Sequence, residues 1–334
     1  MNVLVTGATG FVGVVVCRRL LADGHKVYGT VRGNRPPPHG VIARPITGLE
    51  KYPSGLLNNI EAVVHLAARV HVIGDRARDA LSEFRLVNTE ATLALAEAAT
   101  RSAQRFVFMS SIKVNGDGRG DIAYSEGDAA APADPYGRSK WEAELGLRAL
   151  AERSGLKTTI LRPPLVYGRG VGGNFLMLLK AVARRWPLPF AAVDNLRSLI
   201  HVENLADAVS LVLGASAGTC DTFLLGDGDI STPELIRRLS TAMDRRPRLW
   251  SIAPAMLAAV GRLSGQGAAI DRLIGSLRVD SSLIRTRLGW SPPVALGDGL
   301  SDVARWYLRG SCRHEPKANT RWPFGFSPVH PFID

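Results

Sequence analysis

The sequence contains few cysteines and no long apolar run, and each absence argues against a class of protein. Three cysteines occur among its 334 residues, Cys17, Cys220 and Cys312, and none is close enough to another to form a zinc-ligand pair. A disulfide framework and a structural metal site are therefore not predicted. Because no uncharged run of about twenty apolar residues occurs, we expect no membrane insertion.

A dense basic block is also missing, although the net charge is +11 and the pI is near 10.0. The arginines are scattered along the chain, which disfavours nucleic acid as a partner. An anionic membrane surface or a polyanionic small ligand would also suit such a charge. The first predicted strand starts at Met1 and leaves no room for a cleaved signal peptide, so we expect a cytoplasmic protein.

The N-terminal residues predict a dinucleotide site. Residues 1–7 form an apolar run typical of a buried strand, and helical spacing of apolar residues begins at Phe11. Between them, Gly7 permits a tight turn, Gly10 lets the backbone approach a pyrophosphate, and Gly13 lets the helix pack closely. A glycine turn without a ligand is the alternative, but the order of strand, turn and helix favours binding.

Strands and helices alternate over the first half of the chain. The predicted strands are nearly continuous apolar runs, which indicates a parallel sheet covered on both faces, a doubly wound (Rossmann) α/β fold. Predicted strands cover residues 1–7, 26–31, 41–43, 62–68, 105–110 and 157–161, and predicted helices cover residues 11–22 and 86–103 and begin at Asp134-Pro135.

The pattern loosens after residue 162 and predicts a second, smaller, discontinuous α/β domain that holds the substrate. Helices are expected over residues 174–184 and 203–213 and after an N-cap at Thr232, with extended segments at 198–202 and 222–225. We expect the dinucleotide-binding domain at 1–165 plus about 203–226, the substrate domain at 166–202 plus 227–309, and a loosely ordered tail at 310–334.

A catalytic group is indicated at the start of the long helix. Tyr136 and Lys140 are four residues apart, so they share a helix face. An ammonium beside a phenol favours the phenolate and lowers its pKa toward the working range. Ser110 and Ser111 follow a strand, at the carboxyl end of the sheet where ligands of such folds bind. A chance Tyr-Lys pair is the alternative.

These motifs resemble the extended short-chain dehydrogenases/reductases of the UDP-sugar 4-epimerase-like group. The resemblance spans Met1 to about Leu308. It rests on Gly7-x-x-Gly10-x-x-Gly13, His65-Leu-Ala-Ala68, Asn88, Ser110-Ser111, Tyr136-x-x-x-Lys140, Leu161-Arg-Pro-Pro-Leu-Val-Tyr-Gly168, Arg197-Ser-Leu-Ile-His-Val202 and Leu288-Gly-Trp290.

The resemblance implies a role for each matching residue. Tyr136 would be the general acid/base, Lys140 would hold the nicotinamide ribose, and Ser111 would bind the reacting oxygen. The implied cofactor contacts are Gly7, Thr9, Gly10, Phe11, Val12, Gly13, Leu66, Ala67, Ala68, Asn88, Tyr136, Lys140 and Pro163. The implied substrate contacts are Ser111, Asn174, Arg197 and Arg272. By contrast, His65 and His201 lie in apolar strands and are expected to be hydrogen-bonded core histidines.

The end of the second strand bears on the cofactor. Enzymes that select NAD usually place a carboxylate there for the ribose 2′-hydroxyl. Here the position is Val31, and Arg32 and Arg35 follow it. Arginines would bind a 2′-phosphate, so NADP(H) is favoured and NAD(H) is possible. A solvated role for Arg32 is the alternative.

Residues 110–116 and 171–175 further resemble a subgroup with reductases of UDP-4-keto-6-deoxy-N-acetylhexosamines, which serve bacterial surface polysaccharide synthesis. We therefore expect an NADPH-dependent nucleotide-sugar 4-ketoreductase. The alternative is a 4-epimerase of UDP-GlcNAc or UDP-Glc with bound NAD. A non-catalytic NADP-binding protein is a remote alternative, because Ser111, Tyr136 and Lys140 are all retained.

The expected partner is a UDP- or dTDP-sugar. The family also suggests a homodimer through helices near residues 83–101 and 135–153. Ala91, Ala94 and Ala98 would let two such helices approach closely, or they would face the sheet instead.

Overall fold

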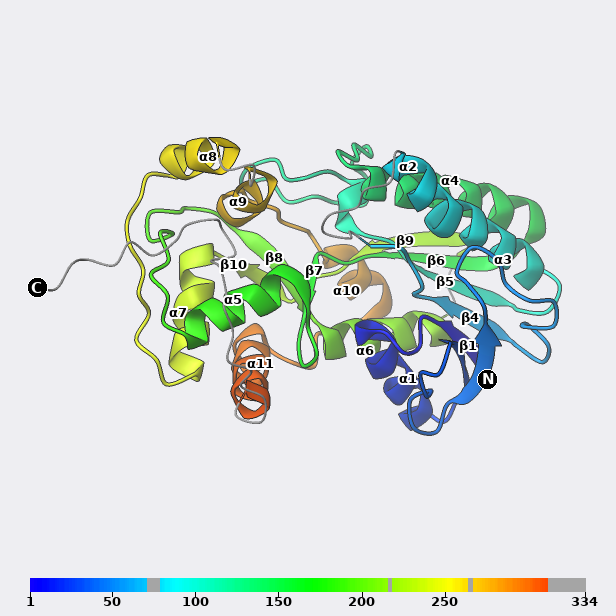
Figure 1. Ribbon diagram of the computed structural model, residues 1–334. Coiled ribbons are helices and arrows are strands. Elements are labelled where there is room, and N and C mark those ends of the chain that lie inside the picture. The colour runs from blue at the N-terminus through cyan, green and yellow to red at the C-terminus, as the bar shows by residue number, and fades with distance from the viewer. Residues whose placement is uncertain (71–78, 216–217, 264–266, 312–334) are drawn as a thin grey trace, which may run out of the picture.

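The computed structural model describes residues 1–70, 79–215, 218–263 and 267–311 and contains two sheets, which lie side by side in Figure 1. The larger has seven parallel strands in the order β3-β2-β1-β4-β5-β6-β9. They are β1 (Asn2–Thr6), β2 (Lys26–Arg32), β3 (Ile42–Ile46), β4 (Ala62–His65), β5 (Arg105–Met109), β6 (Lys157–Arg162) and β9 (Cys220–Leu224). The strand order reverses between β1 and β4, and ligands of such sheets bind at that point.

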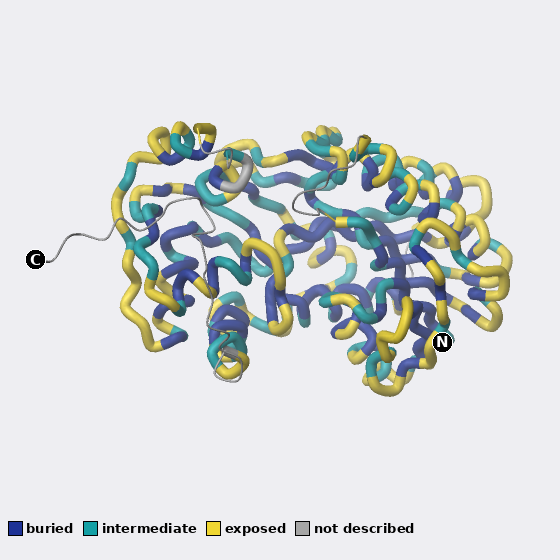
Figure 2. Tube along the Cα trace, viewed as in Figure 1, coloured by how far each residue is buried: buried dark blue, intermediate teal, exposed yellow. Residues whose placement is uncertain are grey.

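Helices cover both faces of this sheet, which confirms the predicted doubly wound fold. Val3 and Val5 of β1 contribute to an apolar cluster with one helical layer, and Leu4 points into a cluster with the other. Figure 2 shows the strands buried between these layers. The first layer is α1 (Phe11–Ala22), α6 (Val202–Gly214) and α10 (Ser282–Leu288); the second is α2 (Ala80–Arg85), the π-helical turn η1 (Leu86–Glu90), α3 (Ala91–Ala99) and α4 (Pro135–Ser154).

The smaller sheet has three strands in the order β10-β8-β7. Its strands are β7 (Leu165–Tyr167), β8 (Arg197–His201) and β10 (Gly228–Ile230). Helices pack around it and enclose a separate apolar cluster. They are α5 (Gly173–Ala183), α7 (Thr232–Ala242), α8 (Pro254–Leu263), α9 (Gly267–Ile274) and α11 (Leu296–Ser311). We propose the two domains given above as the functional division, although Ile284 of α10 and Trp290 pack into the first cluster.

The start of α4 is fixed locally. Asp134 caps the helix by accepting a hydrogen bond of 2.7 Å from the Gly137 backbone N–H, and Pro135 occupies the first turn. The helix ends at Gly155 in the left-handed conformation, with φ +74°. These signals are visible in the sequence, so the position of α4 was predictable.

Elsewhere the boundaries differ from expectation. The helix predicted over 86–103 begins as the π-helical turn η1 and ends at Ala99. Ser231, not Thr232, caps α7, because its Oγ accepts from the Glu234 N–H and the Thr232 hydroxyl donates to Leu273 O. Helix α11 extends through residue 311, and the rest of the predicted tail, 312–334, lies outside the described residues. No helix in the described part of the chain is long and apolar enough to cross a membrane.

Candidate active site

The glycine turn between β1 and α1 is shaped for an anion. Gly7 has φ +69°, and a Cβ on Gly13 would lie 2.1 Å from Gly7 O, so a side chain at Gly13 would push α1 away from the turn. The cap residue, Gly10, places no side chain on the first N–H groups of α1, and the first turn holds no acidic residue. These backbone N–H groups fit the pyrophosphate of a dinucleotide.

The segment after β4 is tied to the glycine turn. Thr6 Oγ1 accepts hydrogen bonds from the Leu66 N–H (3.2 Å) and the Ala67 N–H (3.1 Å) and lies 2.7 Å from His65 Nδ1. His65 Nε2 lies 2.9 Å from Thr92 Oγ1, whose hydroxyl donates to a backbone carbonyl, so Nε2 carries the proton. Burial lowers the pKa of His65 to about 3, and the ring is a neutral core histidine, as expected.

His201 differs from that expectation in one respect. It is buried, 4% exposed, with its ring 5.2 Å from that of Tyr167 in an edge-to-face arrangement. Burial lowers its pKa. Within the described part of the chain, however, neither ring nitrogen has a hydrogen-bond partner. The prediction of a buried histidine is confirmed, and that of a hydrogen-bonded one is wrong.

Asn88, an expected cofactor contact, connects two segments of the chain. It lies in the π-helical turn η1, a feature that often marks functional sites. Its Oδ1 accepts from the Arg69 N–H (2.8 Å), and its Nδ2 donates to Arg69 O (3.0 Å) and Ser139 Oγ (3.1 Å). The Ser139 hydroxyl donates to Tyr136 O (2.8 Å). Asn88 thus holds the segment after β4 against the first turn of α4.

The structure brings Tyr136 and Ser111 together. The Tyr136 hydroxyl is hydrogen-bonded to the Ser111 side chain. Burial raises the pKa of Tyr136 to about 12, and the Ser111 hydrogen bond opposes this shift. Ser111 itself caps the short helical turn η2 (Ile112–Val114), where its Oγ accepts from the Lys113 N–H at 3.2 Å. The two hydroxyls can therefore contact one substrate oxygen.

Lys140 follows Tyr136 by one turn on α4, and its side chain is buried, with 1% of the residue exposed. Its Nζ donates to Met109 O at 2.9 Å and lies 4.5 Å from the centroid of the Phe108 ring. Burial lowers the pKa of Lys140 to about 7, and the charge of Glu144 opposes this shift. The expected lowering of the Tyr136 pKa does not occur in this structure, because burial dominates at the phenol and the ammonium is directed at a carbonyl.

The sequence did not predict a cluster of buried polar side chains that contacts Ser110. Ser110 Oγ donates to Glu144 Oε1 at 2.5 Å, and the Arg162 guanidinium donates to both oxygens of the same carboxylate. Arg162 Nη1 also donates to Asn115 Oδ1 at 2.9 Å. Glu144 is one turn beyond Lys140 on α4, and that spacing was the available signal.

On the substrate side, the structure places Arg197 of β8 near Arg272 of α9. Burial and the charge of Arg272 lower the pKa of Arg197, while Asp117 opposes the shift. Arg197 Nη1 donates to Gly275 O at 2.9 Å. Two guanidinium groups that repel each other would both gain from an anion such as a diphosphate. Asn174 is exposed in the first turn of α5.

Other expected cofactor contacts lie around the glycine turn. The Phe11 ring packs between the two apolar clusters, and a Cβ on Gly170 would lie 3.5 Å from it. Pro163 O accepts from the Ile112 N–H at 3.1 Å, next to Ser111. The side chains of Thr9, Val12 and Ala68 are partly exposed, so a ligand can reach them.

Arg32 and Arg35 are exposed beyond the end of β2. Tyr52, which sequence reasoning missed, lies near Arg32: burial raises its pKa to about 12, while its hydrogen bond to Thr6 and the Arg32 charge oppose the shift. Its ring is 6.3 Å from that of His65. Tyr52 comes from an irregular segment, so no periodic pattern marked it.

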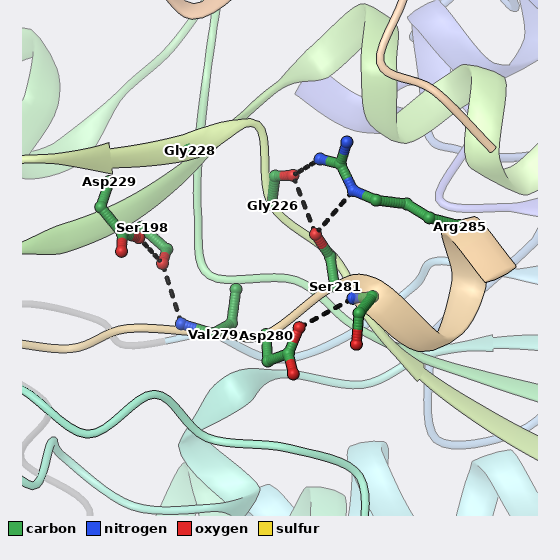
Figure 3. A pocket seen from close by; sticks show the side chains of 9 residues that line it. Ser198, Gly226, Gly228, Asp229, Val279, Asp280, Ser281 and Arg285 are labelled. Atoms are coloured by element: carbon green, nitrogen blue, oxygen red, sulfur yellow. Dashed lines mark hydrogen bonds between the residues drawn. The ribbon is translucent and has the colours of Figure 1, made fainter.

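A polar pocket of about 260 Å³ lies elsewhere, beside the turn between β9 and β10 (Figure 3). Arg285 spans part of its wall, with Nη2 donating to Gly226 O (3.2 Å) and Nε donating to Ser281 Oγ (3.3 Å). None of the expected site residues lines this pocket. Over the described ranges, no group of three His, Cys, Asp or Glu side chains is placed to hold a metal.

Comparison with known proteins agrees with this geometry. Residues 3–226 match the NAD dependent epimerase/dehydratase family. The chain belongs to this family. It is 37% identical over 319 residues to the UDP-glucose 4-epimerase of Vibrio cholerae, covering 93% of this chain and 97% of that protein. It is 28% identical over 347 residues to the dTDP-glucose 4,6-dehydratase of Neisseria gonorrhoeae, covering 94% and 97%.

Among solved structures, it is similar to MoeE5 in complex with UDP-glucuronic acid and NAD. The TM-score is 0.75 at 27% identity, and the match covers 93% of this chain and 100% of that chain. The expected Rossmann fold and the extended short-chain dehydrogenase/reductase family are thus confirmed, and the chain is an enzyme of the nucleotide-sugar epimerase/dehydratase type. The 4-ketoreductase subgroup, the preference for NADP and the roles of individual residues stay predictions.

Proposed function

We propose that the protein is a UDP-hexose 4-epimerase with tightly bound NAD. The likeness to the Vibrio cholerae epimerase extends over nearly the full length of both chains, which favours this activity over the ketoreductase expected from short motifs. The observation that carries the proposal is the hydrogen-bonded pair Tyr136 and Ser111, with Lys140 one turn along α4.

The geometry accounts for reversible proton transfer at the sugar C4 oxygen. Bound NAD supplies a hydride acceptor and, when oxidised, a positive charge that favours the phenolate form of a nearby tyrosine. Tyr136 would take the proton from the 4-hydroxyl when C4 is oxidised to a ketone and would return it to the same oxygen when C4 is reduced on its opposite face. Ser111 holds the oxygen in place throughout, and Lys140 fixes the position of the ribose beside the tyrosine.

Substrate recognition follows from the paired arginines. Arg197 and Arg272 bind the diphosphate, and Asn174 donates from the first turn of α5. Because the diphosphate is attached at C1, across the ring from C4, contacts to it leave the sugar free to present either face to the cofactor. An epimerase needs this freedom.

A second candidate is the NADPH-dependent reduction of a UDP-4-keto-6-deoxy-N-acetylhexosamine. The observation in its favour is the end of β2, where a buried Val31 is followed by an exposed Arg32 and no carboxylate meets the ribose 2′-hydroxyl. An arginine there suits a 2′-phosphate.

The two candidates separate in one experiment. Purified protein is denatured, and the released dinucleotide is identified by mass spectrometry. In parallel, UDP-glucose and UDP-GlcNAc are incubated with the native protein without added cofactor, and a UDP-4-keto sugar is incubated with NADPH or NADH. Bound NAD and cofactor-free epimerisation support the proposal. Turnover only of the keto sugar, with stoichiometric loss of NADPH, establishes the reductase instead.

A further inference from the structure

The end of the molecule opposite the seven-stranded sheet carries an exposed surface that is both apolar and basic. It comprises α8 and the stretch 244–250, which connects α7 to α8 and runs along this end in Figure 1; Figure 2 shows much of it exposed. We call it the α8 face. The catalytic residues Tyr136, Lys140 and Ser111 lie in the other unit and take no part in it.

The apolar part is α8 itself, which has one charged residue, Arg262, among ten. Leu257 and Gly261 are buried on the inner side of α8, and a Cβ on Gly261 would lie 2.9 Å from Ile270 of α9. The outer side is also apolar: Met256 is 61% exposed and Leu263 is 90% exposed. A helix that is apolar on every side normally lies against a second apolar surface, so this face lacks its counterpart.

The basic part precedes the helix. Arg245, Arg246 and Arg248 are all exposed, and Trp250 beside them is 60% exposed. Arg185 joins them, because Arg248 Nη1 donates to its carbonyl at 3.5 Å. Within the described ranges none of these four arginines pairs with a carboxylate, although Asp244 lines a pocket of about 340 Å³ with three of them.

This stretch is held in place by main-chain hydrogen bonds. Leu188 N–H donates to Arg248 O (2.8 Å), Trp250 N–H donates to Leu188 O (2.9 Å), and Ala191 N–H donates to Trp250 O (2.9 Å). The arginines and the tryptophan are therefore presented on a fixed backbone, which reduces the conformational entropy lost when a partner binds.

We propose that the α8 face docks the enzyme on an anionic phospholipid surface. Arginines meet the phosphate groups, Trp250 lies at the level of the head groups, and Met256 and Leu263 enter the acyl boundary. Unpaired positive charge and exposed apolar side chains together are the two signals that reversible membrane attachment needs. Nucleic acid would satisfy the arginines but would gain little from Met256 and Leu263.

Charge also decides against the chain's own C-terminal segment as the occupant. Residues 312–334 contain Arg313, Lys317 and Arg321 against Glu315 and Asp334, so their side chains carry a net charge of only +1. Such a segment supplies no net negative charge for the arginines that border α8, whereas an anionic bilayer would be attracted to them.

The test uses full-length protein and sedimentation with vesicles of phosphatidylcholine alone or of an equimolar mixture with phosphatidylglycerol, at low and high salt. Binding is expected only to the anionic vesicles and is expected to weaken with salt. Replacing the three arginines together (Arg245→Gln, Arg246→Gln, Arg248→Gln) should weaken binding about a hundredfold. The pair Met256→Ser and Leu263→Ser should weaken it at least about tenfold.

The matched control removes the same number of positive charges from the other unit, at exposed lysines outside the proposed dimer contact, with Lys26→Gln, Lys51→Gln and Lys157→Gln. It should bind the vesicles as the parent does, and all three variants should keep the parent's melting temperature and activity. Equal loss of binding in the control would show that only net charge matters and overturn the proposal.

Three other outcomes would also overturn it. The full chain could ignore anionic vesicles while a chain that ends at residue 311 binds them, so that the C-terminal segment is the occupant. A dimer that Met256→Ser and Leu263→Ser dissociate would make the face a subunit contact. Binding to duplex DNA that depends on the arginines but not on Met256 or Leu263, without vesicle binding, would identify a nucleic-acid surface.

Discussion

Arg162 at the end of β6 and Glu144 on α4 form a buried ion pair joined by two hydrogen bonds. The distances are 2.9 Å from Nε to Oε1 and 2.5 Å from Nη2 to Oε2, and the two side chains are 3% and 0% exposed. The same carboxylate accepts from Ser110, the neighbour of Ser111, and lies one turn beyond Lys140. This pair therefore links β6 to the helix that carries Tyr136 and Lys140, and Ser110 ties the segment after β5 to the same carboxylate.

Removing one partner of the pair should destabilise the protein strongly. Glu144→Gln leaves the Arg162 charge buried without a counter-charge, which costs about 3–5 kcal/mol. Chemical denaturation of the purified variant measures this. Glu152→Gln, on an exposed position of the same helix, is the control and should stay within about 0.5 kcal/mol of the parent. Equal stability of the two variants would contradict a structural role for the pair.

Tyr136→Phe should remove the proton acceptor while leaving the dinucleotide site intact. We expect turnover to fall by about 10²–10⁴-fold, the usual contribution of a positioned acid/base. The amount of dinucleotide that co-purifies should not change. Tyr307→Phe makes the same chemical change on α11, away from the site, and should retain full activity. If the Tyr136 variant kept the parent's rate, another residue would be the acid/base.

The protonation of Lys140 should make the folding stability depend on pH between the pKa values of its folded and unfolded states. Its folded pKa is about 7, below the ordinary value of 10.5. Between these values the unfolded chain holds the proton that the folded chain has lost, so stability rises with pH across this window. Below pH 7 the folded protein carries a buried charge at its full desolvation cost. Lys140→Met should thus gain most over the parent below pH 7, and the gain should shrink toward pH 10.5. The melting temperatures of the parent and of Lys140→Met are measured across this pH range. If the two plots of melting temperature against pH ran parallel, the lowered pKa of Lys140 would be refuted.

A substitution at Gly13 tests whether α1 must lie close to the glycine turn. In Gly13→Ala the added Cβ would lie 2.1 Å from Gly7 O and 2.9 Å from the Ala8 carbonyl carbon, so the helix must shift. We expect the variant to lose bound dinucleotide and to melt at a lower temperature. Gly214→Ala, at the end of α6, places its Cβ in open space and serves as the control. Full dinucleotide content in the Gly13 variant would show that the turn does not hold the cofactor.

The α3–α4 face is our proposed homodimer contact. Ala94 and Ala98 are exposed there, whereas Ala91 is buried, and Leu86 and Leu145 are 41% and 48% exposed. Leu145→Arg should convert a dimer into a monomer, because a charge would be buried at its centre. Light scattering after size-exclusion chromatography measures the mass.

The control for this substitution is Ile42→Arg. The exposed Ile42 lies on the edge strand β3 and not on α3 or α4. It should leave the mass unchanged. A monomeric parent would remove the basis for the proposed contact.

The features that could be predicted from sequence are those fixed by neighbouring residues. The glycine turn and the Asp134 cap depend on a few adjacent residues, and the strands are marked by continuous apolar runs. Tyr136, Lys140 and Ser111 could be grouped as candidates because a helix and a strand end impose their spacing.

The features that were missed depend on contacts between distant segments. The Glu144–Arg162 pair joins a helix to a later strand, and Tyr52 reaches Thr6 from an irregular segment. The three-residue strands β7 and β10 are too short for a periodic pattern. The pKa of Tyr136 was misjudged because burial, which spacing does not reveal, raises it and outweighs the hydrogen bond with Ser111.

The most direct test of the proposed epimerase is the fate of the hydrogen at C4. UDP-glucose labelled with deuterium at C4 is incubated with the purified protein without added cofactor, and the product is analysed by nuclear magnetic resonance and mass spectrometry. An epimerase would produce UDP-galactose that retains the deuterium at C4, with no net oxidation or reduction. Unchanged UDP-glucose, together with NADPH-dependent consumption of a UDP-4-keto sugar by the same preparation, would contradict it.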